Sequence, residues 1–160
     1  FEWARLTVQC AAQLGQAGLA APEWKVADAK ELYAASARDG WAADGHEGFV
    51  YTIDFDGDVV VPERMHWVAC EGIAAAAVLH SRTKDERYAA DYTEWWDHAA
   101  VYFADRMAGS WWHERAADGS PSSTVWSGKP DVYHAAQATL LPRLPASPSL
   151  SSSLAAGNLA

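Results

Sequence analysis

The amino-acid sequence predicts an all-α fold in which antiparallel helix pairs are joined by loops that carry short β-hairpins. Apolar residues recur at helical spacing along most of the chain, and Asp-Gly dipeptides flanked by strand-like runs interrupt them twice. Half of the 160 residues are hydrophobic and nine are tryptophan, so one domain can bury a sizeable core. The order helix, helix, hairpin, helix, helix, hairpin, helix suits a toroid of paired helices, although an irregular helical domain would give the same order.

The first two helices are expected to pack as an antiparallel pair because the link between them is short. The apolar stripe of the first helix contains Trp3, Leu6, Cys10 and Leu14. This helix should end near residue 16, where glycines interrupt the pattern. The second helix should begin at Pro22-Glu23 and run to about residue 38, with Gly40 as its stop.

The middle of the chain predicts a hairpin followed by a third helix. Residues 49–55 and 58–61 flank Asp56-Gly57, a dipeptide favoured in two-residue hairpin turns. The third helix should start at Pro62-Glu63 and run to about His80. One face of it carries Trp67, Cys70, Glu71, Ala74 and Val78.

Thr83 and Glu86 have the spacing of a capping box, so a fourth helix is expected from there to about Met107. The runs 110–115 and 122–127 then predict a second, looser hairpin.

That hairpin would turn at Asp118-Gly119, and the helix after it should carry His134 and end at Pro142. We expect a domain over residues 1–145, followed by a flexible tail over 146–160, where small residues are frequent and periodicity is absent.

Charge and composition exclude several classes of function. The net charge is −9 with a pI near 5.0, and Lys and Arg form no cluster, so we expect no nucleic-acid or anionic-membrane partner. No apolar run is long enough to cross a bilayer, which leads us to expect a cytoplasmic protein. Cys10 and Cys70 lack the spacing of a zinc or redox site and are expected to be buried free thiols. Oligomeric state is not indicated. The chain begins in mid-helix pattern without Met, which suggests a piece of a longer protein.

His134 is the first candidate for chemistry. Lys129-Pro130-Asp131 precedes it, and proline at the first helical position with an acidic neighbour is a favourable helix start. Tyr133 and His134 therefore project from the first turn. Histidine gives and takes protons near neutral pH, so His134 is a candidate acid or base, although a structural histidine is the alternative.

Trp67 and Glu71 are four residues apart and share one helix face. An aromatic plate beside a carboxylate suits a sugar, and the alternative is a core tryptophan with a satisfied glutamate. Glu2 lies near Arg5, where a solvated surface pair is the alternative. Glu2 and Glu71 would also suit glycoside hydrolysis. We predict no metal site, because the histidines lack ligand spacing and residues 54–58 are too short for a calcium loop.

Four motifs in order resemble the N-acylglucosamine 2-epimerase superfamily, and within it the aldose–ketose isomerase branch that includes mannose isomerases and sulfoquinovose isomerase. The motifs are residues 1–6, 66–76, 109–114 and 126–137. The resemblance implies an (α/α)6 barrel, of which this chain would be the C-terminal part, with short β-hairpins in its loops.

The resemblance also implies roles for single residues. Glu2 matches the glutamate of a His-x-x-Glu pair whose histidine would precede Phe1, and His134 matches the second catalytic histidine. Trp67 and Glu71 match positions that line the sugar pocket. Three further residues match motif positions without an assigned role: Lys129, Asp131 and Gln137.

The implied activity is a cofactor-independent sugar isomerase or 2-epimerase that acts on a mannose-like aldose. Both reactions remove a proton α to a carbonyl and pass through an enediol, which two positioned acid/base groups can accomplish without a metal. In the family, the histidine that matches His134 moves the C2 proton, and the His-x-x-Glu pair assists ring opening. The partner would be a monosaccharide. A non-catalytic sugar- or protein-binding relative and an (α/α)6 glycosidase remain alternatives, and the chain alone is expected to be inactive.

Overall fold

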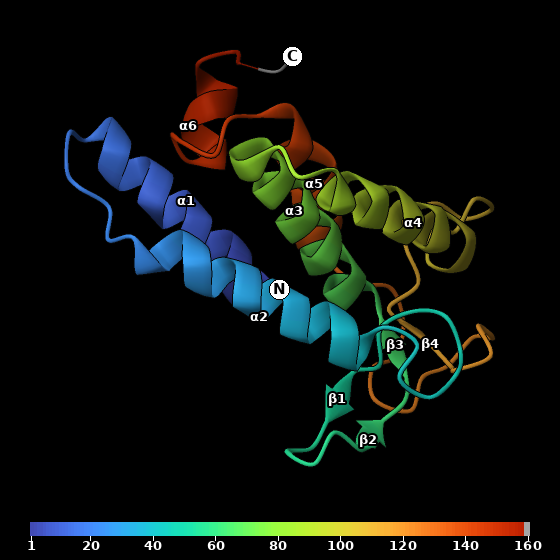
Figure 1. Ribbon diagram of the computed structural model, residues 1–160. Coiled ribbons are helices and arrows are strands. Elements are labelled where there is room, and N and C mark those ends of the chain that lie inside the picture. Colours follow the sequence, from blue (N-terminus) through green and yellow to red (C-terminus); the bar gives the residue numbers. More distant parts are fainter. Residues whose placement is uncertain (159–160) are drawn as a thin grey trace.

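The computed structural model describes residues 1–158 as two antiparallel helix pairs with a further helix against their centre (Figure 1). Helices α1 (Glu2–Gln16) and α2 (Trp24–Gly40) form the first pair, and α3 (His66–Thr83) and α4 (Glu86–Tyr102) form the second. Helix α5 (Tyr133–Leu140) packs on α3 and is followed by the 3-10 turn Leu141–Arg143. The predicted all-α fold with helix pairs is confirmed.

Helix α3 lies at the centre of the core because small residues let its neighbours come close. Residues 74–76 are all alanine and are at most 1% exposed. A Cβ placed on Gly72 would lie 3.1 Å from the Phe49 ring and 3.3 Å from the Trp95 ring. The glycine is therefore required by the close approach of two aromatic side chains rather than by its backbone angles.

The buried face of α1 differs from the predicted one. The structure buries Ala4, Arg5, Val8 and Ala11. Trp3 is 73% exposed and Cys10 is exposed as well, so the prediction of two buried thiols is wrong for Cys10 and confirmed for Cys70. Mostly small side chains occupy the inner face of α1, because this helix packs closely on both α2 and α3.

The first predicted hairpin is confirmed. Strands β1 (Thr52–Ile53) and β2 (Val59–Val61) pair antiparallel. The turn is longer than the predicted two residues, since Asp54 N–H donates to the Asp58 carbonyl 2.9 Å away, with residues 55–57 between them. Asp54 Oδ1 also accepts from two backbone N–H groups of the turn.

The second predicted hairpin is present only as an isolated antiparallel bridge between Arg115 and Pro121, without paired strands. Strand β4 (Glu114–Arg115) pairs with β3 (Arg64–Met65), not with residues 122–127. This pairing also moves the start of α3 from the predicted Pro62-Glu63 to His66, because residues 64–65 are extended. The turn at Asp118-Gly119 is present, with Ala116 N–H donating to the Ser120 carbonyl.

The boundaries of α4 also differ from the prediction. Asp85 caps the helix through a hydrogen bond from Arg87 N–H, whereas the Thr83 hydroxyl donates to the Leu79 carbonyl of the preceding helix. The helix ends at Tyr102 rather than Met107, and Phe103 is buried at 1% exposure. In the segment after residue 145, the chain forms helix α6 (Leu150–Ala155), which the lack of periodicity did not indicate.

The β1–β2 and β3–β4 strand pairs lie together at one end of the helix pairs, and α6 lies at the other end (Figure 1). The N-terminal ends of α1, α3 and α5 meet near the hairpin end, as contacts between their side chains show.

Candidate active site

Backbone N–H groups at the first residues of α3 and α5 donate hydrogen bonds that fix where each helix starts. His66 N–H donates to the His113 carbonyl at 3.1 Å, which ties the first residue of α3 to the chain beside β4. Asp131 Oδ1 accepts from Tyr133 N–H at 2.8 Å and thereby begins α5. The predicted site residues Trp67 and His134 therefore project from first turns.

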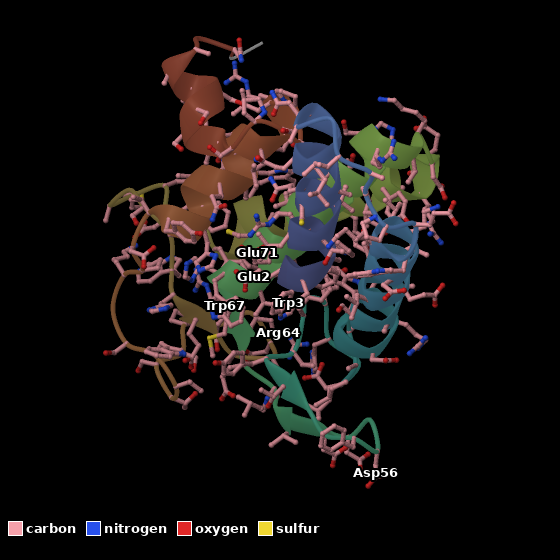
Figure 2. The ribbon with its side chains drawn as sticks, turned by 90° about the vertical axis from the view of Figure 1, so that its left-hand side faces the viewer. Glu2, Trp3, Asp56, Arg64, Trp67 and Glu71 are labelled. Atoms are coloured by element: carbon pink, nitrogen blue, oxygen red, sulfur yellow. The ribbon has the colours of Figure 1, made fainter. Side chains whose placement is uncertain are left out.

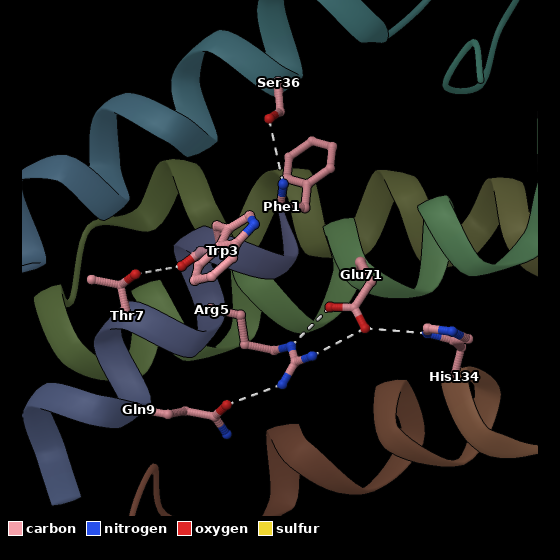
Figure 3. A network of polar contacts seen from close by, with 8 residues as sticks. All are labelled: Phe1, Trp3, Arg5, Thr7, Gln9, Ser36, Glu71 and His134. Carbon is pink, nitrogen blue, oxygen red and sulfur yellow. Dashed lines mark hydrogen bonds and ion pairs between the residues drawn. The ribbon is translucent and has the colours of Figure 1, made fainter. Parts of the chain in front are cut away.

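A buried ion pair connects three helices (Figure 3). Arg5 Nε lies 2.9 Å from Glu71 Oε2, and Arg5 Nη2 lies 3.0 Å from Glu71 Oε1. His134 Nδ1 lies 3.2 Å from the same Oε1. Arg5 and Glu71 are each 3% exposed, so the ion pair between them is almost fully buried. Such a bidentate guanidinium–carboxylate pair sets both the position and the plane of the carboxylate.

Sequence reasoning did not identify Arg5 as part of this network. The alternative of a solvated Glu2/Arg5 surface pair is wrong for Arg5, which is buried against Glu71. The feature of the sequence that could have indicated a buried partner was Glu71, a carboxylate in the strongly apolar helix α3. A carboxylate in such a helix needs a cationic partner, and Arg5 lies beside the small residues of α1.

A pocket of about 380 Å³ borders Glu71 on its α1 and α2 side. Glu2, Trp67 and Glu71 lie close together in this region, far from the Asp56 turn (Figure 2). The other lining residues include Phe1, Ser36, Asp39, Phe49, Tyr51, Ile53 and Val68. Three of the four predicted site residues therefore line one pocket.

His134 adjoins the pocket through the residues that line it. Its ring centroid is 5.9 Å from that of Trp67, and its Nδ1 contacts Glu71. Its side chain is 23% exposed. Trp67 is also packed edge-to-face against Tyr51, which fixes the indole between the pocket and His134.

Two further histidines, His66 and His113, extend the cluster of rings that includes His134. The ring centroid of His66 is 6.1 Å from that of His134 and 5.0 Å from that of His113. Burial, and secondarily the neighbouring His113, lowers the pKa of His66 to about 4, so its ring is neutral at pH 7. Sequence reasoning treated His66 only as a potential metal ligand, although it directly precedes Trp67 in a matched motif.

Glu114 orders the loop that leads to α5. Its carboxylate accepts from the N–H groups of Thr124, Val125 and Trp126 at 2.8, 2.9 and 2.7 Å, and from the hydroxyl of Ser122. Burial alone would raise the pKa of Glu114, but these hydrogen bonds lower it to about 2. The loop over residues 122–126 is therefore held mainly by Glu114, and the Thr124 hydroxyl also contacts Glu63.

The matched positions without an assigned role also hold loop structure. Lys129 pairs with Asp105, and its ammonium group lies 3.8 Å from the centroid of the Trp112 ring. Asp131, which precedes the N-cap residue of α5, accepts from Tyr133 N–H as described above. Gln137 is 9% exposed on the inner face of α5.

Residues 1–158 contain neither a metal-binding cluster nor a membrane-spanning helix. No set of three or more His, Cys, Asp or Glu side chains in this range is arranged to hold a metal ion. No helix in the same range is long and apolar enough to cross a membrane.

The chain matches known sugar isomerases along most of its length. The family model of N-acylglucosamine 2-epimerase matches residues 1–138. D-mannose isomerase of Thermobifida fusca is 55% identical over 155 residues, which are 96% of this chain and 37% of that protein. D-mannose isomerase of Pseudomonas cannabina pv. alisalensis is 46% identical over 155 residues, which are 97% of this chain and 37% of that protein. The chain thus spans 37% of the length of each relative.

Solved structures show the same fold. A crystal structure of D-mannose isomerase superposes with a TM-score of 0.77 at 25% identity, over 88% of this chain and 34% of that one. Cellobiose 2-epimerase from Spirochaeta thermophila gives a TM-score of 0.60 at 20% identity, over 78% of this chain and 31% of that one. These matches confirm that the helices form part of an (α/α)6 barrel.

Proposed function

Because the chain belongs to the N-acylglucosamine 2-epimerase family, we propose that it is the C-terminal part of an enzyme that interconverts a mannose-like aldose and its ketose. The observation that carries this proposal is the contact between His134 and the buried carboxylate of Glu71, beside a pocket that contains Trp67 and Glu2. A sugar bound there would meet an aromatic face, two carboxylates and a histidine.

His134 is the acid/base group in this proposal. Its Nδ1 faces Glu71, so an Nδ1–H would donate to the carboxylate and leave Nε2 with a free lone pair. Nε2 then takes the proton from C2 of the open-chain aldose, the electrons of the C–H bond form the C1–C2 double bond, and the carbonyl oxygen on C1 takes a proton from the second acid/base group to give the enediol. Proton transfer to C1 with loss of the proton on the C2 oxygen gives the ketose, whereas proton transfer to the opposite face of C2 with loss of the proton on the C1 oxygen gives the epimer.

Glu2 lies in the first turn of α1, is exposed, and borders the same pocket. By resemblance, Glu2 would orient a histidine that precedes Phe1 and assists ring opening and proton transfer. This pair would supply the second of the two acid/base groups that the enediol route requires.

Trp67 and Glu71 would bind the sugar. The indole offers an apolar face to the C–H groups of the substrate. Of the four lone-pair sites of the Glu71 carboxylate, Arg5 and His134 use three, which leaves one acceptor for a sugar hydroxyl.

The ion pair disfavours the glycosidase alternative. Glycoside hydrolysis needs one protonated carboxyl group that donates to the leaving oxygen. Both Glu71 oxygens instead accept hydrogen bonds from the guanidinium of Arg5, so this carboxyl group is engaged as an acceptor and is not presented as a donor.

The deciding experiment uses the protein that contains this chain together with its upstream region. Mannose is incubated with it in deuterated water, and NMR follows both ketose formation and deuterium incorporation at C1 and C2. We expect both signals without added metal or cofactor. Sugar binding without either signal would favour the non-catalytic alternative and would contradict the proposal.

A further inference from the structure

We propose that Arg5 is a positioning residue that fixes the orientation and tautomer of the His134 ring by holding Glu71. This inference rests on the proposed function, in which His134 moves the proton. The three side chains come from α1, α3 and α5 and form one continuous series of contacts (Figure 3).

The position of Glu71 Oε1 depends on Arg5. The guanidinium binds both Glu71 oxygens, at 2.9 and 3.0 Å, and so fixes the rotation of the carboxylate about its terminal bond. The oxygen that faces His134 Nδ1 is Oε1, which Arg5 Nη2 also binds. Without the second arm of the guanidinium, Oε1 would be free to rotate away from the imidazole.

The guanidinium is itself held. Arg5 Nη1 donates to Gln9 Oε1 at 3.0 Å, and Gln9 lies one turn further along α1. Arg5 and Glu71 are each 3% exposed, so solvent competes little for their hydrogen bonds. The orientation of His134 is thus tied to α1 through a series of largely buried hydrogen bonds.

The orientation of Glu71 in turn determines which ring nitrogen of His134 carries the proton. A carboxylate that faces Nδ1 favours the Nδ1–H tautomer, which leaves Nε2 as the base. Lysine would keep the positive charge at position 5 but present a point charge in place of the planar fork. Arg5→Lys therefore removes the orientation and keeps the charge.

The test measures the His134 tautomer and turnover separately. In the protein that includes the upstream region, labelled with nitrogen-15 at histidine, the His134 signals are assigned by their loss in His134→Gln. The ring is observed under alkaline conditions in which imidazole is neutral. We expect Arg5→Lys to lower the Nδ1–H population of His134 and to lower kcat by about 10- to 100-fold, with a much smaller change in KM.

Arg87→Lys is the matched control, because Arg87 pairs with Asp85 on the surface at the start of α4, with 54% of its side chain exposed. It should change neither the tautomer nor kcat. If Arg5→Lys does not fold, Gln9→Ala decides, since it removes only the support of Nη1 and should shift the tautomer in the same direction.

A folded Arg5→Lys protein with the wild-type tautomer overturns the inference, whether its kcat falls or not, because a fall without a tautomer change indicates a merely structural role. A wild-type tautomer in Gln9→Ala has the same meaning when Arg5→Lys does not fold. If the wild-type protein does not exchange the C2 hydrogen, the proposed function fails, and the tautomer measurement still decides the role of Arg5.

Discussion

At the scale of single residues, the site was predictable where a side chain stands in a motif and unpredictable where it acts through packing. Trp67 and Glu71 were singled out by their four-residue spacing, and His134 by its position after a proline. Arg5 was missed because helical periodicity alone does not tell which face of α1 is buried. Its burial depends on the small residues of that face and on α3, which is 66 residues away along the chain.

The first residue-scale prediction concerns His134→Gln. Glutamine keeps a hydrogen-bonding group near Glu71 but cannot move a proton, so exchange of the C2 hydrogen with deuterated solvent should fall by about 10²- to 10⁴-fold. Sugar binding, measured by calorimetry, should remain within a few-fold of wild type. Near-normal exchange in a folded variant would remove His134 from the mechanism.

The second residue-scale prediction concerns acid stability. Burial lowers the pKa of His66 and of His98 to about 4, with Arg64 contributing for His98. Between pH 6.5, the value in an unfolded chain, and pH 4, the unfolded state binds protons that the folded state does not. The free energy of unfolding should therefore fall as the pH falls through this window, by up to about 1.4 kcal/mol per pH unit for each histidine.

Urea unfolding between pH 5 and 7 checks this dependence. The lowered pKa of Glu114, about 2, makes the free energy of unfolding fall as well once the pH drops below about 5, so the histidine effect is measured above that value. His98→Phe should flatten the slope, because His98 packs among aromatic rings such as Tyr102 and its Nδ1 has no partner. An unchanged slope in that variant would contradict the assignment.

At the scale of elements, helices α1 to α4 were predictable from periodicity and α5 from its Lys129-Pro130-Asp131 entry, whereas the β3–β4 pair was not predictable. The end of α1 and the start of α2 were recognisable from glycine and proline, whereas α3 begins at His66 rather than at Pro62-Glu63 and α4 ends at Tyr102 rather than at Met107. Strands β3 and β4 are two residues each and pair across 49 residues, so no local pattern marks them. This pairing nevertheless sets the first residue of α3 and therefore the place of Trp67.

The first element-scale prediction concerns the packing of α3. Gly72→Ala adds a Cβ that would lie 3.1 Å from Phe49 and 3.3 Å from Trp95, both large and enclosed side chains. We expect a loss of about 1–3 kcal/mol of stability from this overpacking. Gly15→Ala in α1, where nothing lies within 4 Å, is the control and should be neutral or stabilising by up to about 1 kcal/mol. Equal effects in the two variants, measured by chemical unfolding, would contradict the packing argument.

The second element-scale prediction concerns the loop before α5. Glu114→Gln keeps the shape of the side chain but replaces one acceptor oxygen with an NH₂ group that faces N–H donors. We expect a loss of about 1–3 kcal/mol in local stability. Hydrogen exchange should accelerate at residues 122–126. Glu31→Gln on the exposed face of α2 should leave that exchange unchanged, and slow exchange in Glu114→Gln would show that the loop is held by other contacts.

At the scale of the whole molecule, the resemblance to an (α/α)6 barrel supplied what local patterns left open. Periodicity allowed either a toroid or an irregular helical domain, because both consist of the same helices. The two folds differ in how successive helix pairs are arranged around a ring. This chain contains only part of such a ring, since it covers 34% of the matched mannose isomerase structure. The outer face of α1 is consistent with such a ring, since its large apolar side chains are exposed although they recur at helical spacing.

The whole-molecule prediction is that the 160-residue chain alone is inactive and associates, whereas the protein with its upstream region is active. Trp3 and Trp24 are 73% and 53% exposed, and Leu6 is 40% exposed on the same face of α1 as Trp3. Exposed apolar surface of this kind promotes association. The proposed mechanism also requires a histidine ahead of Phe1. Light scattering should show a mass that rises with concentration for the short chain, and the same preparation should give no C2 exchange with mannose. A monomeric short chain that matched the turnover of the longer protein would show that this third of the barrel contains the complete site.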